Sequence, residues 1–460
     1  MKLLGRWFAG LISDRFFRSV GILVGGTAAA HLITMATLPI ATRLYRPADF
    51  AILAFVTSAS SIISAAACLR FDIAIPIPRD DREAVNCLAL AIFWTVVTTL
   101  LLAVLAVMMS GQIAQLFHRS DYAPYLWLVP VMVCSMGVYS SLQYWFVRRG
   151  QFSTIASNRV LQTSSSAATQ IILGMSQFAP TGLLLGVAAN WLVGSVGLSV
   201  RFLRRDTSLL STVSRSMMVN VFIAQRRFPI FSAPEALLNS ASIFVPIVFI
   251  SIFANGPESG FIMLAMQVMQ APMALVGSAV ANVYFAEAPA QFRANRLGEF
   301  TDQIFSRLLR SGVGPLAFAG FVAPVTFSLI FGTEWTRAGE LVSWMTPWFI
   351  MQFLSSPLST SLLVTSHQST AFVLQLFGFI VRIGAVLAAF LTAPSLVGEV
   401  YALSGLLFYA VYLVVVLAIA SNGIRSLRRE FVRSTPIVLS WILAGFAANV
   451  ALATLFSLRG

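Results

Sequence analysis

The chain has 460 residues, of which 58% are apolar and 10% are charged, and its mean hydropathy is +0.84. A chain of this composition cannot cover itself with a water-compatible surface, so we predict an integral membrane protein rather than a soluble domain. A net charge of +13 would suit a nucleic-acid binder, but the arginines stand in short loops between apolar runs, which argues against that partner.

Apolar runs of roughly 20 residues predict an all-α fold, because each run matches the ~30 Å hydrocarbon core of a bilayer at about 1.5 Å per helical residue. We expect about 12–13 transmembrane helices. The apolar runs lie near residues 20–42, 50–69, 84–109, 124–147, 160–178, 181–201, 230–253, 260–284, 311–331, 341–364, 371–392, 397–421 and 436–457.

The distribution of basic residues predicts the orientation of the chain. If the N-terminus is cytoplasmic, most of the 30 lysines and arginines fall on the cytoplasmic side, as the positive-inside rule requires. Residues 1–19 mix aromatic and basic side chains, which fits a helix lying on anionic lipid and equally fits a solvated lead-in. The basic interval 202–229 is expected to link two halves and to lie near anionic lipid.

Two stretches, Pro39–Leu90 and Pro246–Gln291, follow one plan: an apolar run with a proline, a proline–acid turn, a second apolar run and a charged connector. This plan predicts two six-helix lobes, residues 20–201 and 230–421, which are parallel repeats around a central cavity. Residues 422–460 are predicted to form a basic loop and an extra helix.

The sequence contains no nucleotide cradle, zinc motif or Ser-His-acid order, so we expect neither an enzyme nor a cofactor or metal. Cys68, Cys87 and Cys134 have no metal-ligand spacing and no evident disulfide partner. We interpret these three cysteines as small packing residues.

Arg382 lies near the middle of the apolar run 371–392. A charge inside a membrane span is costly unless it faces a cavity or a partner. A guanidinium suits a pyrophosphate because its donors are forked and its charge is permanent, so we predict that Arg382 binds substrate. The alternative is a structural bond to a neighbouring helix.

Other polar residues within predicted spans are candidates for contacts with substrate hydroxyls, although each could instead bond one helix to another. The candidates are Arg159, Gln162, Asn239 and Gln270.

His31 and Glu235 lie in the first and seventh spans, which are equivalent in the two halves. A titratable pair in these positions would offer proton coupling. The alternative is again a polar side chain bonded to an adjacent helix.

Three segments carry a resemblance to a known family. They are Arg43-Leu-Tyr-Arg-Pro-Ala-Asp-Phe-Ala51, Tyr144-Trp-Phe-Val-Arg-Arg-Gly-Gln-Phe152 and Phe331-Gly-Thr-Glu-Trp-Thr-Arg-Ala-Gly339. With them the chain resembles bacterial polysaccharide and lipopolysaccharide biosynthesis membrane proteins, which are O-antigen and exopolysaccharide repeat-unit flippases. These flippases are a branch of the multidrug/oligosaccharidyl-lipid/polysaccharide exporter superfamily. One departure is Ala51, where the family pattern would have glycine.

The resemblance implies a flippase that moves undecaprenyl-pyrophosphate-linked oligosaccharide across the bacterial inner membrane by alternating access. It also implies cationic residues along the substrate path, and a polysaccharide polymerase and a chain-length regulator as protein partners. The alternatives are a multidrug exporter, which would need acidic residues within its spans, and an exporter of another lipid-linked precursor. A glycosyl polymerase would need a large external loop, and none is predicted.

Overall fold

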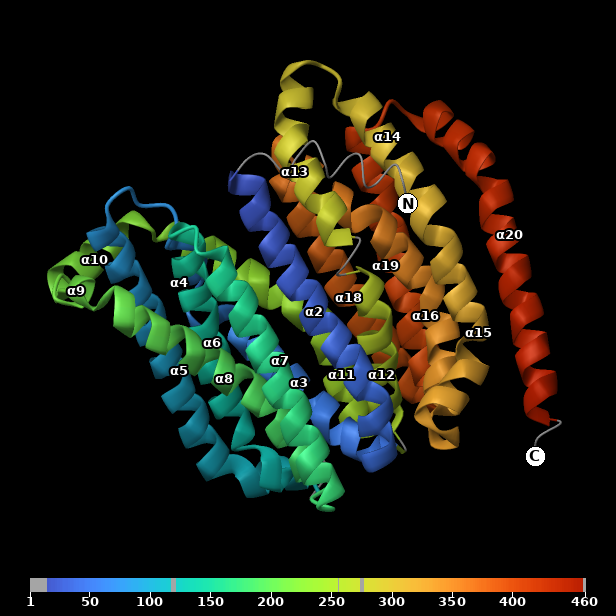
Figure 1. Ribbon diagram of the computed structural model, residues 1–460, viewed down its shortest axis with the longest axis horizontal. Coiled ribbons are helices and arrows are strands. Elements are labelled where there is room, and N and C mark those ends of the chain that lie inside the picture. Colours follow the sequence, from blue (N-terminus) through green and yellow to red (C-terminus); the bar gives the residue numbers. More distant parts are fainter. Residues whose placement is uncertain (1–14, 117–120, 255, 274–276, 458–460) are drawn as a thin grey trace. The chain divides into compact units, whose positions relative to one another are not determined.

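Helix is the regular structure found throughout residues 15–116, 121–254, 256–273 and 277–457, which are the residues that the computed structural model describes (Figure 1). The long helices are α2 (Arg15–Leu44), α3 (Pro47–Ala67), α5 (Asp81–Leu116), α6 (Leu128–Arg148), α7 (Phe152–Met175), α8 (Thr181–Arg205), α11 (Ala233–Phe253), α12 (Glu258–Pro272), α13 (Ser278–Arg293), α14 (Leu297–Leu308), α15 (Gly314–Phe331), α16 (Thr336–Ser355), α18 (Gln368–Thr392), α19 (Val397–Ala420) and α20 (Ile424–Ser457).

Short helical segments connect the long ones. They are α4 (Phe71–Ala74), η1 (Ala123–Tyr125), α9 (Thr207–Leu210), α10 (Arg215–Ala224), η2 (Phe228–Ser232), η4 (Leu309–Val313), η5 (Thr333–Trp335), η6 (Ser356–Leu358), α17 (Ser361–Val364) and η7 (Pro394–Leu396).

Within the described residues each predicted span falls mainly on helix, which confirms the all-α prediction. Among the described residues, 10 helical stretches are long and apolar enough to cross a membrane, and the extra C-terminal helix, at Val432–Leu452, is one of them. Three predicted spans are not among these stretches. The span near 160–178 falls on α7, the span near 260–284 falls on α12 and α13, and the span near 341–364 falls mainly on α16.

The first compact unit extends to Tyr45 and resumes at Phe55–Phe244. Within it α7 packs against both α2 and α8, and α6 packs against α5 and α8. The α7–α8 contact is close because Gly194 and Gly197 have no side chain. A Cβ added there would lie 2.3 Å from Gln162 Oε1 and 2.2 Å from Asn158 Oδ1, respectively.

The second compact unit comprises Arg46–Ala54 and Val245–Gly460. Its α16 packs against α15 and α19, α18 packs against α19, and α20 lies along α15 (Figure 1). The beginnings of α3 and α12 touch within this unit: a Cβ added to Gly260 would lie 2.2 Å from the Pro47 carbonyl oxygen and 2.8 Å from Ala51 N. Gly260 therefore permits the close approach, and Ala51 is buried at the contact.

The two repeated stretches have matching helices. Pro39 lies inside α2 and Pro246 lies inside α11, and the next helix in each case begins at a proline–acid turn, with Asp49 in the first turn of α3 and Glu258 in the first turn of α12. After α3, the prolines limit α4 to four residues before α5 begins at Asp81, as expected for a connector that cannot continue as one helix.

The predicted linker 202–229 lies within the first unit. It forms α9 and α10, and α10 packs against α5. Asn86 on α5 is buried and donates from Nδ2 to the Thr212 carbonyl at 3.2 Å, and its Oδ1 accepts from Ser214 N at 3.1 Å. Of the predicted N-terminal segment 1–19, residues 1–14 lie outside the described residues, and residues 15–19 form the beginning of α2.

Candidate functional site

The end of α6 carries a group of ion pairs, here named the first charge cluster: Asp81, Arg148, Arg149 and Asp206. Arg148 donates from Nε and Nη2 to Asp81 Oδ1 at 3.2 and 2.9 Å, and Arg149 Nη1 donates to Asp81 Oδ2 at 2.8 Å. Arg149 Nη2 also donates to Asp206 Oδ1 at 2.9 Å, while the buried Trp145 donates from Nε1 to Asp206 Oδ2 at 3.0 Å. Two arginines therefore face two aspartates where α5, α6 and the end of α8 meet.

The first charge cluster also holds the proline-containing connector before α5. Arg148 donates from Nη1 to the carbonyls of Pro76, at 3.4 Å, and Pro78, and from Nη2 to the carbonyl of Arg79 at 3.2 Å. Proline interrupts helical hydrogen bonding, so carbonyls near it need other donors. The guanidinium supplies these donors.

The second unit contains a different arrangement, here named the second charge cluster: Glu258, Arg337, Glu340 and Glu399. Arg337 Nη2 donates to Glu258 Oε1 at 2.8 Å, and its Nη1 and Nη2 donate to Glu399 Oε1 and Oε2 at 2.7 and 2.9 Å. Nη1 also donates to the more exposed Glu340 at 3.2 Å. One arginine thus joins the first turns of α12, α16 and α19.

The electrostatics of the second charge cluster favour a charged arginine and oppose a fully charged acid. The hydrogen bond with Glu399, followed by that with Glu258, raises the pKa of Arg337 despite its partial burial. Burial raises the pKa of Glu258 above its usual range, although the hydrogen bond and charge of Arg337 oppose the rise. Burial therefore makes Glu258 easier to protonate than an exposed glutamate.

The residues around Arg337 position this cluster. Gly332 ends α15 with φ 109°, a conformation that favours glycine, and directs the chain into η5. Trp335 is buried and packs edge-on against Phe50 at 4.8 Å and Phe261 at 6.0 Å between ring centroids. The Phe331–Gly339 motif thus builds a helix junction.

Arg382, the predicted pyrophosphate ligand, is 1% exposed. Its guanidinium carbon lies 4.5 Å from the ring centroid of Phe408 and 5.4 Å from those of Trp348 and Tyr409. Cations over aromatic faces are stabilised by the ring quadrupole. The structure therefore places Arg382 in an aromatic enclosure formed by α16, α18 and α19.

Arg159 and His31 are brought together on the facing sides of α7 and α2. Both are partly exposed, and the two helices pack against each other. Arg159 Nη1 also donates to Thr27 Oγ1 at 2.5 Å. The predicted partner of His31 was Glu235, but no hydrogen bond or ion pair joins these two residues within the described chain.

The remaining predicted residues divide by exposure. Gln162 is 9% exposed and packs against α8 at Gly194. Glu235 and Asn239 are exposed one turn apart on α11, and Gln270 is exposed on α12. Gln162 thus has the position of a helix-packing residue, whereas the other three have accessible side chains.

Sequence reasoning did not assign roles to the members of the two charge clusters. Arg148, Arg149 and Arg337 were used only as parts of family motifs, and their acidic partners were not paired with them. One signal in the sequence could have identified the acidic partners of these arginines. An acid stands in the first turn of α5, α12 and α19, as at Asp81.

The fold defines the class: a multi-pass helical membrane protein. It is similar to a structure described as lipid II flippase MurJ in an inward closed conformation, with a TM-score of 0.70, 10% identity, and coverage of 95% of this chain and 97% of that chain. It is also similar to an inward-facing multidrug resistance MATE family transporter of the MOP superfamily (TM-score 0.59, 13% identity, 90% and 94% covered). The eukaryotic MATE transporter AtDTX14 is a third similar structure, with a TM-score of 0.57 and 16% identity. The match covers 92% of this chain and 100% of that chain.

The family is given by the sequence. The chain belongs to the polysaccharide biosynthesis protein family, which it matches over residues 40–340. Among curated proteins, none matches the sequence significantly. The predicted family resemblance is therefore confirmed.

Proposed function

We propose that this protein is a flippase that moves an undecaprenyl-pyrophosphate-linked oligosaccharide from the cytoplasmic to the external leaflet of the bacterial inner membrane, for surface polysaccharide synthesis. The observation that carries the proposal is one chain that combines a polysaccharide biosynthesis family match over residues 40–340 with a fold similar to a lipid II flippase over 95% of its length. A transporter of this kind works by binding and movement and needs no catalytic group of its own.

A half-exposed arginine on α7, the fifth span predicted from sequence, supports this proposal. The Arg159 guanidinium donates to Thr27 Oγ1, and the side chain keeps part of its surface accessible. A membrane arginine in this situation is expected where a helix borders a polar path, because lipid would make the charge costly. We assign the cargo contacts to Arg159, Asn239 and Gln270, and a coupling role to His31 or Glu235.

Arg382 needs a separate assignment, because Trp348, Phe408 and Tyr409 enclose it. A contact between its guanidinium and a pyrophosphate requires these rings to move. The alternative role is structural, since Arg382 connects α18 to α16 and α19. Arg382→Met separates the binding role from the structural role, because methionine keeps an unbranched apolar side chain among the rings but carries no charge for a pyrophosphate.

The test is complementation of surface polysaccharide in a flippase-null strain, normalised to membrane abundance, with lipid-linked repeat units assayed in parallel. The wild-type chain should restore polysaccharide and clear the accumulated repeat units. Arg159→Gln should lower transport per molecule about tenfold, as expected for losing a charged hydrogen bond of ~1.5 kcal/mol, whereas exposed Arg204→Gln should not. Drug export without repeat-unit clearance would favour the multidrug alternative.

The orientation belongs to the same proposal. A reporter fused after Arg215 should read as cytoplasmic and one fused after Gly256 as external, because the basic residues favour the cytoplasmic side. Identical readings at both positions would refute the proposed direction of transport.

A further inference from the structure

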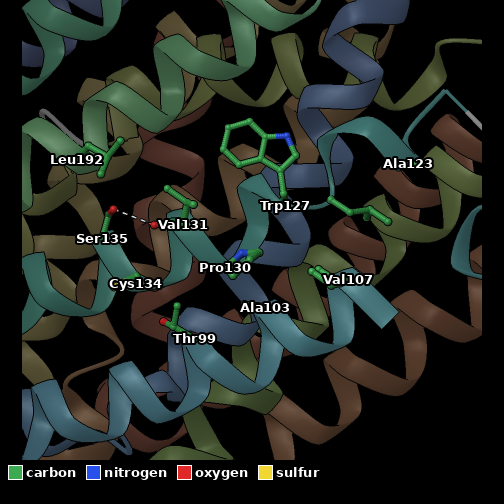
Figure 2. A pocket seen from close by; sticks show the side chains of 12 residues that line it. Thr99, Ala103, Val107, Ala123, Trp127, Pro130, Val131, Cys134, Ser135 and Leu192 are labelled. Carbon is green, nitrogen blue, oxygen red and sulfur yellow. Dashed lines mark hydrogen bonds between the residues drawn. The ribbon is translucent and has the colours of Figure 1, made fainter. Parts of the chain in front are cut away.

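A lateral groove in the first unit lies between α5, α6 and α8 (Figure 2). Its volume is about 750 Å³. Small side chains create the hollow, including Ala103 and Ala106 on α5 and Cys134 on α6, while Trp127 and Leu192 border it. All three helices are among those long and apolar enough to span a membrane, so the groove lies along helices that are expected to be in contact with hydrocarbon.

The groove offers an occupant mainly apolar contacts. Ser135 is one of its few polar lining residues, and its hydroxyl donates to the Val131 carbonyl at 2.8 Å within α6, as the dashed line in Figure 2 shows. At the rim, Val107 is 81% exposed and Trp127 is 54% exposed. Large apolar side chains therefore remain uncovered at the edge of the groove.

The position of the groove indicates which end of a lipid it would receive. From Trp127 to Ser135 along α6 is about 12 Å at 1.5 Å per residue, a little less than one leaflet of the ~30 Å hydrocarbon core. Tryptophan at one end is typical of the interface, and the predicted orientation makes that interface the external one. The occupant would thus be a hydrocarbon tail whose head group lies at the external surface.

We propose that this groove holds the methyl-branched polyisoprenoid tail of the lipid carrier in the external leaflet. The inference rests on the proposed function, which supplies a polyprenyl-linked cargo. A branched chain is thicker than a straight acyl chain and so makes more contacts with the walls of a wide hollow lined by alanines. The groove would keep the tail beside the protein while the head group is released.

The experiment uses the full chain in phospholipid nanodiscs that contain undecaprenyl phosphate. The photoreactive residue p-benzoylphenylalanine replaces Val131 in the groove or, as the control, Leu101, which is 62% exposed on α5 and does not line the groove. Cross-linked products are identified by mass spectrometry. The ratio of undecaprenyl phosphate to phospholipid adducts should be several-fold higher at Val131 than at Leu101.

Equal ratios at the two positions would show ordinary boundary lipid and would overturn the proposal, as would a cross-link from Val131 to a second copy of the chain. Filling the groove with Ala106→Trp should abolish the enrichment at Val131, while Leu101→Trp should leave it intact. If Ala106→Trp fails to fold, the Val131 comparison still decides. No enrichment at Val131 in the chain without the Ala106→Trp change, together with normal complementation by the wild-type protein, would reject the groove assignment alone. Enrichment at Val131 without complementation would reject the proposed function alone.

Discussion

The two charge clusters both pair arginines with carboxylates, but in different proportions. In the first charge cluster, Asp81 is shared by two arginines and Asp206 balances the second charge, so arginines and aspartates are equal in number. In the second charge cluster, Arg337 is shared by three glutamates, so negative charges are in excess when all are ionised. The first cluster also has backbone carbonyls as acceptors, whereas the second depends on a single guanidinium.

This difference indicates how each helix junction responds to change. A cluster with two arginines can lose one contact and keep another, but a cluster with one arginine has no substitute donor. The excess of carboxylates also makes the second cluster sensitive to protonation, since a proton on Glu258 relieves repulsion among the acids. We therefore expect mutations and pH to affect the second cluster more strongly.

Arg337→Ala should have the largest effect. It leaves Glu258 and Glu399 together without their donor, and breaking a largely buried ion pair in this way costs on the order of 3 kcal/mol. Membrane abundance and the unfolding temperature in detergent should both fall sharply. Arg337→Lys should give an intermediate loss, because one ammonium cannot form the paired bonds of a guanidinium. Exposed Arg293→Ala is the matched control, and an equal loss there would show that the cluster is not responsible.

Asp81→Asn should destabilise the protein less, by about 1–2 kcal/mol. Arg149 keeps Asp206, and Arg148 keeps the connector carbonyls, so neither guanidinium loses every partner. Thermal unfolding in detergent measures the change, with exposed Glu83→Gln as the control on the same helix turn. A loss equal to that of Arg337→Ala would contradict the comparison between the clusters.

Gly398→Ala tests the space that the second charge cluster needs. The added Cβ would lie 2.4 Å from Glu258 Oε1 and 2.7 Å from Leu341 Cδ2. Because Arg337 fixes the Glu258 carboxylate, this overpacking should cost about 1 kcal/mol. Gly384→Ala on α18, where nothing lies within 4 Å of the added atom, should be neutral or slightly stabilising. Similar behaviour of the two variants would show that Glu258 is free to move.

The smallest expected effect is a pH dependence through Glu258. Its pKa is raised in the folded protein, so the protonated acid is favoured by folding, and this contribution is present below the ordinary pKa of glutamate and is lost as pH rises through the raised pKa. The unfolding temperature should therefore fall slightly as pH rises through this window. Glu258→Gln should flatten that part of the profile, and an unchanged profile would assign the dependence to another group.

Local sequence was sufficient to predict the membrane class, the helices and the repeated plan. Hydropathy follows runs of neighbouring residues, and a run of about 20 apolar residues has one main solution in a bilayer, which is a helix. Proline interrupts a helix wherever it stands inside one, so the break at Pro76 and Pro78 could also be predicted from local sequence. The family match rests on contiguous motifs, so it too was available from sequence.

Tertiary structure alone decided what each charged residue does. Arg382 and Arg159 were both predicted from sequence to contact the cargo, yet rings from α16 and α19 enclose the first while the second keeps an accessible side. Arg337 meets Glu258 and Glu399 across 79 and 62 residues of chain. Hydropathy predicts that a helix crosses the membrane, but its rotation and its neighbours depend on how the helices pack, and these determine whether a charge is enclosed, paired or exposed.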